Sequence, residues 1–128
     1  MTETAVTDDV VVTRWLEGHH KPQPMPGGGT RPPKDVFSPS SDGSGLSVCL
    51  YTTDEERMAI RSRHDRALWV MFTAGDLRDS GLEVVREPTP DEPLHGSIIG
   101  WPTESAARGR LQKQLTKVCR WDGAAPAV

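Results

Sequence analysis

The last third of the chain has the most informative pattern of apolar and polar residues. Residues 95–100, HGSIIG, have the composition of a strand, and the segment 101–103, WPT, follows it as the start of a helix. Apolar side chains then recur at helical spacing, at Ala107, Leu111, Leu115 and Val118. A strand followed by an amphipathic helix is a folding unit, so the pattern predicts a packed domain in this region.

The middle of the chain predicts a strand, a helix and a second strand. Residues 46–51 alternate, which places three apolar side chains on one face: Leu46, Val48 and Leu50. Thr53 and Glu56 form a capping box, which predicts a surface helix to about Arg63. The continuous apolar run 67–72 favours a central strand that is covered on both faces.

Shorter elements are expected between this run and the last third of the chain. Residues 73–80 can form one or two helical turns, which Gly81 closes. Residues 82–86 predict a further strand. The proline-rich segment 88–93 then serves as a rigid connector to the strand over 95–99.

The first elements of the chain allow two interpretations. Residues 7–9, TDD, can cap a short helix that ends at Gly18, with a buried stripe of Val11, Val12, Trp15 and Leu16. The alternative is a strand over 10–13, because all four of these residues are β-branched. We favour the helix, because the stripe continues beyond residue 13.

Three segments are expected to lie outside the packed body. Residues 1–6 predict a frayed terminus, and residues 122–128 predict a tail. Residues 19–44 predict a long irregular loop, because their prolines and three consecutive glycines oppose regular structure there. Within this loop, Val36 and Phe37 are expected to pack back onto the core.

These elements together predict an α+β fold. We expect residues 1–128 to form a single domain, with a mixed sheet of about four strands and two to four helices. The hydrophobic content of 35% is low for a packed core, but it is not typical of a disordered chain.

The composition restricts the cellular compartment and the classes of partner that we expect. The net charge is −3 and the sequence pI is about 5.8, which disfavours a general nucleic-acid binder. Cys49 and Cys119 are expected to be free thiols in a reducing cytoplasm. No signal-peptide pattern and no apolar run of the roughly 20 residues that span a bilayer is present, so we expect a cytoplasmic location without membrane contact.

A loose resemblance rests on a few short motifs. These are Phe37, the segments 45–48 (GLSV) and 81–84 (GLEV), and His95 with the segment 98–100 (IIG). In this layout the chain resembles short uncharacterised bacterial proteins. The resemblance implies a free-standing domain of this kind, and it carries no activity.

Two kinds of side chain are candidates for binding. Trp101 and Trp121 flank the last helix, and exposed tryptophans are typical of partner surfaces. Four basic side chains are candidate anion contacts: Arg14, Arg108, Arg110 and Lys113. The alternative for the basic residues is a solvated helix face, with cations favoured towards the C-terminal end of the helix dipole.

Histidine supplies the only candidate for catalysis. His95 and Ser97 share one strand face, and a histidine beside a hydroxyl is the minimum for general-base activation. The alternative is that both simply lie on the polar face of an edge strand. His19 and His20 are adjacent and lack the spacing of convergent ligands, so we expect no metal site and no cofactor.

Three functions therefore remain open. The first is a non-catalytic binding or adaptor module that engages a protein partner through Trp101 or Trp121. The second is a small enzyme acting on a phosphate-bearing ligand, with His95 as acid/base and Arg14 and Arg108 as anion contacts. The third is nucleic-acid binding through the basic last helix.

Overall fold

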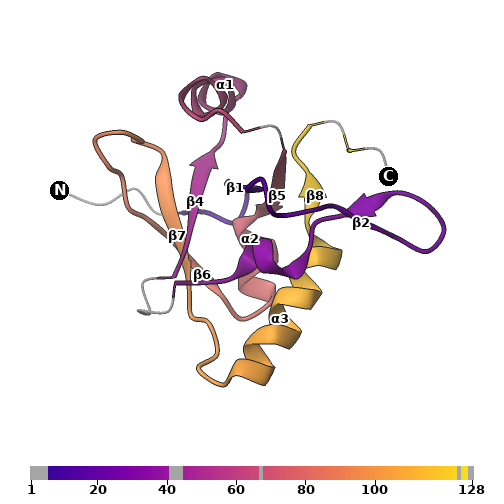
Figure 1. The fold of residues 1–128 in the computed structure, drawn as a ribbon. Coiled ribbons are helices and arrows are strands. Elements are labelled where there is room, and N and C mark those ends of the chain that lie inside the picture. The colour runs from indigo at the N-terminus through magenta and orange to yellow at the C-terminus, as the bar shows by residue number, and fades with distance from the viewer. Residues whose placement is uncertain (1–5, 41–44, 67, 124, 127–128) are drawn as a thin grey trace.

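The computed structural model describes residues 6–40, 45–66, 68–123 and 125–126. Within them lies a six-stranded antiparallel sheet with the order β6-β7-β4-β1-β5-β8 (Figure 1). Its strands are β1 (Val11–Trp15), β4 (Leu46–Tyr51), β5 (Trp69–Thr73), β6 (Glu83–Arg86), β7 (His95–Ile99) and β8 (Arg120–Trp121). A separate two-stranded sheet pairs β2 (Gln23–Pro24) with β3 (Thr30–Arg31).

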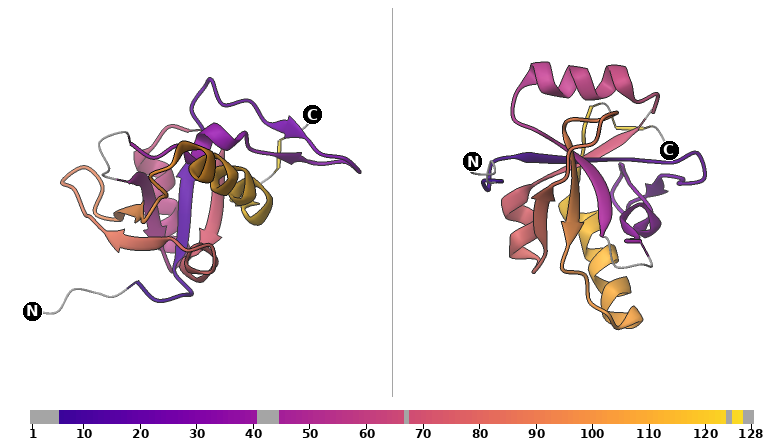
Figure 2. Two further views of the ribbon diagram at one scale, coloured as in Figure 1. Left: turned by 90° about the horizontal axis from the view of Figure 1, so that it is seen from below. Right: turned by 90° about the vertical axis from the view of Figure 1, so that its left-hand side faces the viewer.

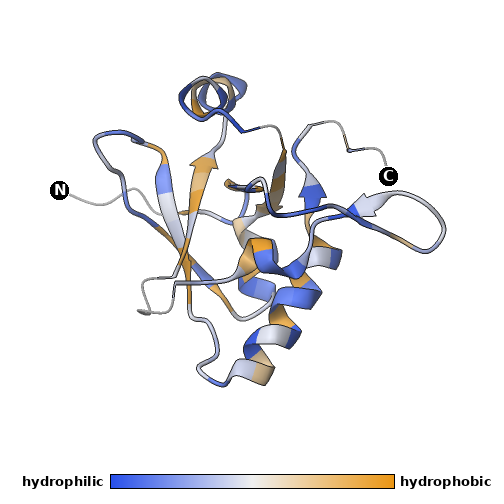
Figure 3. Cartoon of the chain, in the orientation of Figure 1, coloured by the Kyte–Doolittle hydropathy of each residue, from blue (hydrophilic) through white to orange (hydrophobic). Residues whose placement is uncertain are grey.

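Helices surround the larger sheet. The described residues form α1 (Asp54–Arg63), α2 (Ala74–Asp79), α3 (Ser105–Val118) and the 3-10 turn η1 (Lys34–Phe37). Figures 1 and 2 show α1 well separated from α3, with strands of the sheet between them. Apolar residues concentrate on the strands, whereas α3 carries both apolar and polar positions (Figure 3).

One face of the sheet forms the larger core. Val12 of β1 lies between Leu50 of β4 and Phe72 of β5, and all three side chains are buried on this face. Phe37 of η1 and Leu115 of α3 cover them, each with an exposed fraction of 0%. This arrangement confirms that the segment around Phe37 packs back onto the core.

The opposite face of the sheet forms a smaller core under α1. Ile60 of α1 packs there with Cys49 of β4 and Trp69 of β5. Trp15 of β1 lies at the edge of this cluster, where its ring meets that of Trp69 edge-on. The sheet therefore buries alternate residues of β4 and β5 on both of its faces.

The prediction of a helix over 7–18 is wrong. Val11, Val12 and Thr13 belong to β1, which pairs with β4 on one side and with β5 on the other. The strand wins because its β-branched residues fill both faces of the sheet, and because both of its edges find partners. The apolar stripe that suggested a helix is also compatible with alternation, since Val12 faces one core and Trp15 the other.

The sheet is larger than the four strands expected, and it is antiparallel rather than mixed. The additional strands are β1, where the sequence pattern favours a helix, and β8, whose two residues are too few to leave an alternating pattern. The α+β class itself is confirmed. The strands over 46–51 and 95–99 and the capping box of α1 are also confirmed.

The segments expected outside the body are partly held within it. Residues 19–44 contain β2, β3 and η1, so they are not a structureless loop, and residues 41–44 lie outside the described part. Of the expected frayed terminus, residues 1–5 also lie outside the described part, but Val6 is buried and its carbonyl accepts from Arg78. The expected tail is wrong at its start, because Asp122 is buried.

Candidate functional site

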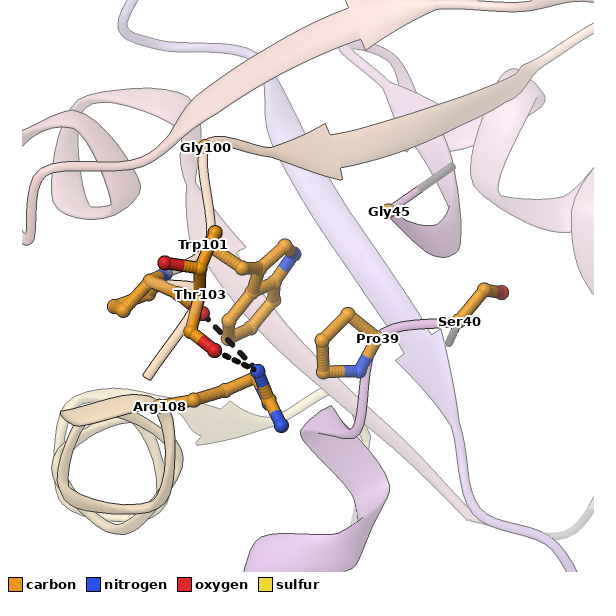
Figure 4. A pocket seen from close by; sticks show the side chains of 8 residues that line it. Pro39, Ser40, Gly45, Gly100, Trp101, Thr103 and Arg108 are labelled. Atoms are coloured by element: carbon orange, nitrogen blue, oxygen red, sulfur yellow. Dashed lines mark hydrogen bonds between the residues drawn. The ribbon is translucent and has the colours of Figure 1, made fainter. Parts of the chain in front are cut away.

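A hollow lies where β7 leads into α3. It has a volume of about 540 Å³ and receives residues from three segments of the chain (Figure 4). We call it the Trp101 pocket, and its lining residues are Pro39, Ser40, Gly45, Gly100, Trp101, Pro102, Thr103 and Arg108.

Trp101 reaches this pocket because the chain turns sharply after β7. Gly100 has a φ of +91°, a left-handed conformation that favours glycine. The turn directs the indole of Trp101 back against the core, where its Nε1 donates to the carbonyl of Ile98 at 2.8 Å. The side chain is half-buried, so its hydrogen bond is satisfied while part of the ring lines the pocket.

Arg108 lies in the first turns of α3 and closes the other side of the pocket. Its Nη1 donates to the carbonyls of Pro102 and Thr103, each at 3.2 Å. Figure 4 shows the guanidinium extending beside the Trp101 ring towards Pro39. Among the described residues Arg108 has no carboxylate partner.

The described lining of this pocket suits binding better than catalysis. Arg108 is its only charged side chain, and Ser40 and Thr103 supply its only hydroxyls. None of these described residues is a histidine, cysteine, lysine or carboxylate that could act as a general base. Apolar surface comes from Trp101 and from two prolines. The pocket therefore offers an aromatic and proline surface next to a cation.

The other candidate cations of α3 lie on a different face of the helix. Arg110, Lys113 and Lys117 are exposed, and their spacing of three and four residues places them in one stripe. Arg108 is half-buried and points away from that stripe. The basic helix thus divides into one residue in the Trp101 pocket and a separate exposed stripe.

Trp121 lines a second, smaller hollow of about 280 Å³, together with Met25, Lys117 and Arg120. Its Nε1 donates to the carbonyl of Thr30 at 3.0 Å, which ties β8 to the two-stranded sheet. Both tryptophans expected at a partner surface are therefore half-buried residues that border hollows.

Arg14 does not join these sites. Its guanidinium lies 4.4 Å from the centroid of the Trp15 ring and donates to the carbonyls of Val36 and Ser47. Burial lowers the pKa of Arg14, and nearby Glu17 only partly offsets this effect. Its hydrogen bonds connect β1 to η1 and β4, which is a structural role.

His95 and Ser97 each bond to Glu87 rather than to each other. The Nδ1 of His95 lies 2.8 Å from the Glu87 carbonyl oxygen, and the Ser97 hydroxyl donates to the Glu87 carboxylate. His95 lines none of the described hollows, whereas Arg108 lines the Trp101 pocket. The structure therefore does not bring together the acid/base and anion contacts that the enzyme hypothesis requires.

Sequence reasoning missed a cluster on the other face of the sheet. Cys49, His64 and Glu92 each place a side-chain N, O or S atom within 4.8 Å of the others. Cys49 is buried, and His64 is partly exposed at the end of α1. Its imidazole stacks on Trp15 with an interplanar angle of 8°. No local sequence signal joins these three residues, because the strand order alone brings them together.

Burial and neighbouring polar groups shift the pKa values of two members of this cluster. Burial raises the pKa of the Cys49 thiol to about 12, so the free protein holds it as a neutral thiol. Burial would also raise the pKa of Glu92, but hydrogen bonds from Arg63, the Leu94 amide and His64 outweigh it, and the pKa lies below its ordinary value. Glu92 is therefore ionised.

Among the described residues no helix is both long and apolar enough to cross a bilayer. Comparisons of the chain with protein-family models, with curated proteins and with solved structures found no significant match.

Proposed function

We propose that this chain is a small non-catalytic binding module that captures a segment of a partner protein in the Trp101 pocket. The bound segment carries a bulky apolar side chain next to a carboxylate. The observation that carries this proposal is the convergence of Trp101 and Arg108 on one hollow.

The size and lining of the pocket support a binding role. A volume of about 540 Å³ falls within the range of ligand pockets, roughly 300–1,000 Å³. Tryptophan and arginine are the residues most enriched among those that dominate binding energy at protein interfaces. Because their donors to the protein are already placed, both side chains are held in position before a partner arrives.

The charge of Arg108 selects the chemistry of the partner. A guanidinium with free N–H groups binds a carboxylate through two parallel hydrogen bonds. The N-cap of α3, Glu104, makes no side-chain cap, and the first turn of the helix carries no acidic residue. The free backbone amides at this end of the helix favour an acidic group of a partner, against the repulsion of the Glu104 carboxylate.

The proposal can be tested by selecting random displayed peptides on the wild-type protein. We expect enriched peptides to pair an acidic residue with a bulky apolar one. Arg108→Gln should weaken the binding of such a peptide at least about tenfold, because a charge-assisted contact is lost. Fluorescence titration of labelled peptide measures the effect.

Arg110→Gln is the matched control. Arg110 has the same charge and lies two residues away on the same helix, but it is exposed and outside the pocket. The Arg110→Gln substitution should change the affinity for the peptide by less than about twofold. Trp101→Ala should also abolish binding, with a melting curve to confirm folding. Equal effects of the two arginine variants would contradict the proposal.

The exposed stripe of α3 supports nucleic-acid binding as a second candidate. Lys113 shares one hollow with Arg31 and Lys34, and Lys117 shares the next with Arg31 and Arg120. A net charge of −3 opposes it. A filter-binding titration with duplex DNA decides, because true binding must weaken steeply with salt and with Lys113→Gln. Retention of DNA that does not depend on salt, or no retention of DNA at all, would contradict this second candidate function.

We also propose a cytoplasmic location. Cys49 and Cys119 are both free, which suits a reducing compartment.

A further inference from the structure

The Cys49 cluster has the composition and spacing of a metal site. The Nε2 atom of His64 lies 4.0 Å from the Cys49 Sγ and 2.7 Å from the Glu92 Oε1. Cys49 and Glu92 both face the same ring nitrogen of His64. In a catalytic relay, by contrast, the carboxylate and the thiol face opposite nitrogens of the imidazole. The arrangement here is three donor atoms around one common point.

We infer that Cys49, His64 and Glu92 bind a divalent transition-metal ion of the zinc class. The bond lengths of zinc to sulfur, nitrogen and oxygen, about 2.0–2.3 Å, place tetrahedral donor atoms roughly 3–4 Å apart. The observed separations of 4.0 and 2.7 Å differ from that spacing by less than about 1 Å. Side-chain adjustments of this size do not require the fold to change.

Three separate elements hold the donors in place. Cys49 lies in β4, and His64 is the residue that ends α1, with its backbone N–H bonded to the Ile60 carbonyl. Glu92 lies in the connector between β6 and β7, in a turn closed by its amide bonding to Thr89. The Leu94 carbonyl accepts from the Leu50 amide, which fastens that connector beside β4.

Outer contacts orient the donors, as they do around metal ligands generally. Arg63 donates to both carboxylate oxygens of Glu92, and the Leu94 amide donates to Oε2. Trp15 fixes the plane of the His64 ring by stacking on it. The His64 side chain is 29% exposed, whereas Cys49 and Glu92 are buried.

The donor set selects the metal. Calcium and magnesium take oxygen ligands, whereas a thiolate with an imidazole selects zinc, cobalt and related ions. On binding, the Cys49 thiol loses its proton to solvent and a sulfur–metal bond forms. The imidazole proton that faces Glu92 must then sit on Nδ1, so that the Nε2 lone pair binds the metal.

The simpler alternative is a purely structural ion-pair cluster. Arg63 already neutralises Glu92, and its positive charge, together with that of nearby Arg61, opposes a second cation. The Glu92 carboxylate and the Cys49 thiolate together balance the charge of a divalent ion, but only if the Cys49 thiol ionises. The two interpretations therefore differ in one observable, which is a thiolate–metal bond.

Cobalt(II) titration of the full chain tests this bond. We expect one Co²⁺ per chain, a thiolate-to-cobalt charge-transfer band in the near ultraviolet and displacement of that band by Zn²⁺. Cys49→Ser should abolish the band, and His64→Gln should weaken Co²⁺ binding at least about tenfold. Cys119→Ser and His95→Gln are the matched controls, since neither residue belongs to the cluster; both should retain the band.

A second readout guards against a variant that does not fold. Zn²⁺ should raise the melting temperature of the wild type and of Cys119→Ser, and should raise that of His64→Gln by less. A folded wild-type protein without a charge-transfer band would overturn the inference. So would loss of the band in Cys119→Ser. Neither result bears on peptide binding at the Trp101 pocket, which lies on other elements.

Discussion

At the scale of single residues, the buried carboxylate of Asp122 shows how a distant contact holds the chain end. Thr13 and Tyr51 donate to its Oδ2, at 2.9 and 3.2 Å. Arg57 pairs with Oδ1 at 2.8 Å and Arg61 with Oδ2 at 2.9 Å. Asp122 thus connects α1 and β8 across the smaller core, and its contacts stabilise the sheet edge.

Asp122→Asn should lower the free energy of unfolding by about 2–3 kcal/mol at neutral pH, because two arginines lose a buried partner. Both arginines keep some solvent contact, so the loss stays below that of a fully buried pair. Urea denaturation measures it. Asp79→Asn, at an exposed site, should change stability by less than about 0.5 kcal/mol.

A comparison of the wild type with Asp122→Asn at different pH values also tests the protonation of Asp122. Burial alone would raise its pKa, but hydrogen bonds from Arg57 and Thr13 outweigh it, and the folded-state pKa is lowered. The stabilisation is therefore complete above the unfolded value, about 3.9, and is lost as pH falls through the folded value. The stability difference between wild type and Asp122→Asn should shrink below about pH 4. A constant difference would contradict this assignment.

At the scale of elements, the sequence predicts a strand correctly where apolar and polar residues alternate and where the apolar residues are buried. The strand over 46–51 has both, and all of its residues except Ser47 are buried. β1 could not be distinguished from a helix, because its partners β4 and β5 come later in the chain. The contacts of Glu92 and Asp122 were equally hidden, since each carboxylate pairs with residues 28 or more positions away.

Two glycines in regular elements should respond oppositely to alanine. In β7, a Cβ on Gly96 would lie 2.7 Å from the Val85 carbonyl oxygen and 2.8 Å from the Leu50 Cδ1. Gly96→Ala should therefore cost about 1–3 kcal/mol. In α3, a Cβ on Gly109 meets nothing within 4 Å, so Gly109→Ala should stabilise the protein by about 0.5–1 kcal/mol. Thermal melting of both variants checks these signs.

At the scale of the whole molecule, the sheet separates two different environments. α3 and η1 cover one face, and the Trp101 pocket opens beside them, whereas α1 covers the metal-type cluster on the other face. Trp101 and Arg108 were predicted singly from sequence, as a partner contact and an anion contact. Their convergence depends on the turn at Gly100 and on the path of residues 39 and 40, which no local pattern records.

The most direct measurement is a nuclear magnetic resonance titration of the indole N–H signals with a selected acidic–apolar peptide. The chain has four tryptophans, so each signal reports one site. Binding in the Trp101 pocket should shift the Trp101 signal and leave that of Trp121 in place, with the shift lost in Arg108→Gln. A peptide that instead moves the Trp121 signal, or leaves all four unmoved, would contradict the account.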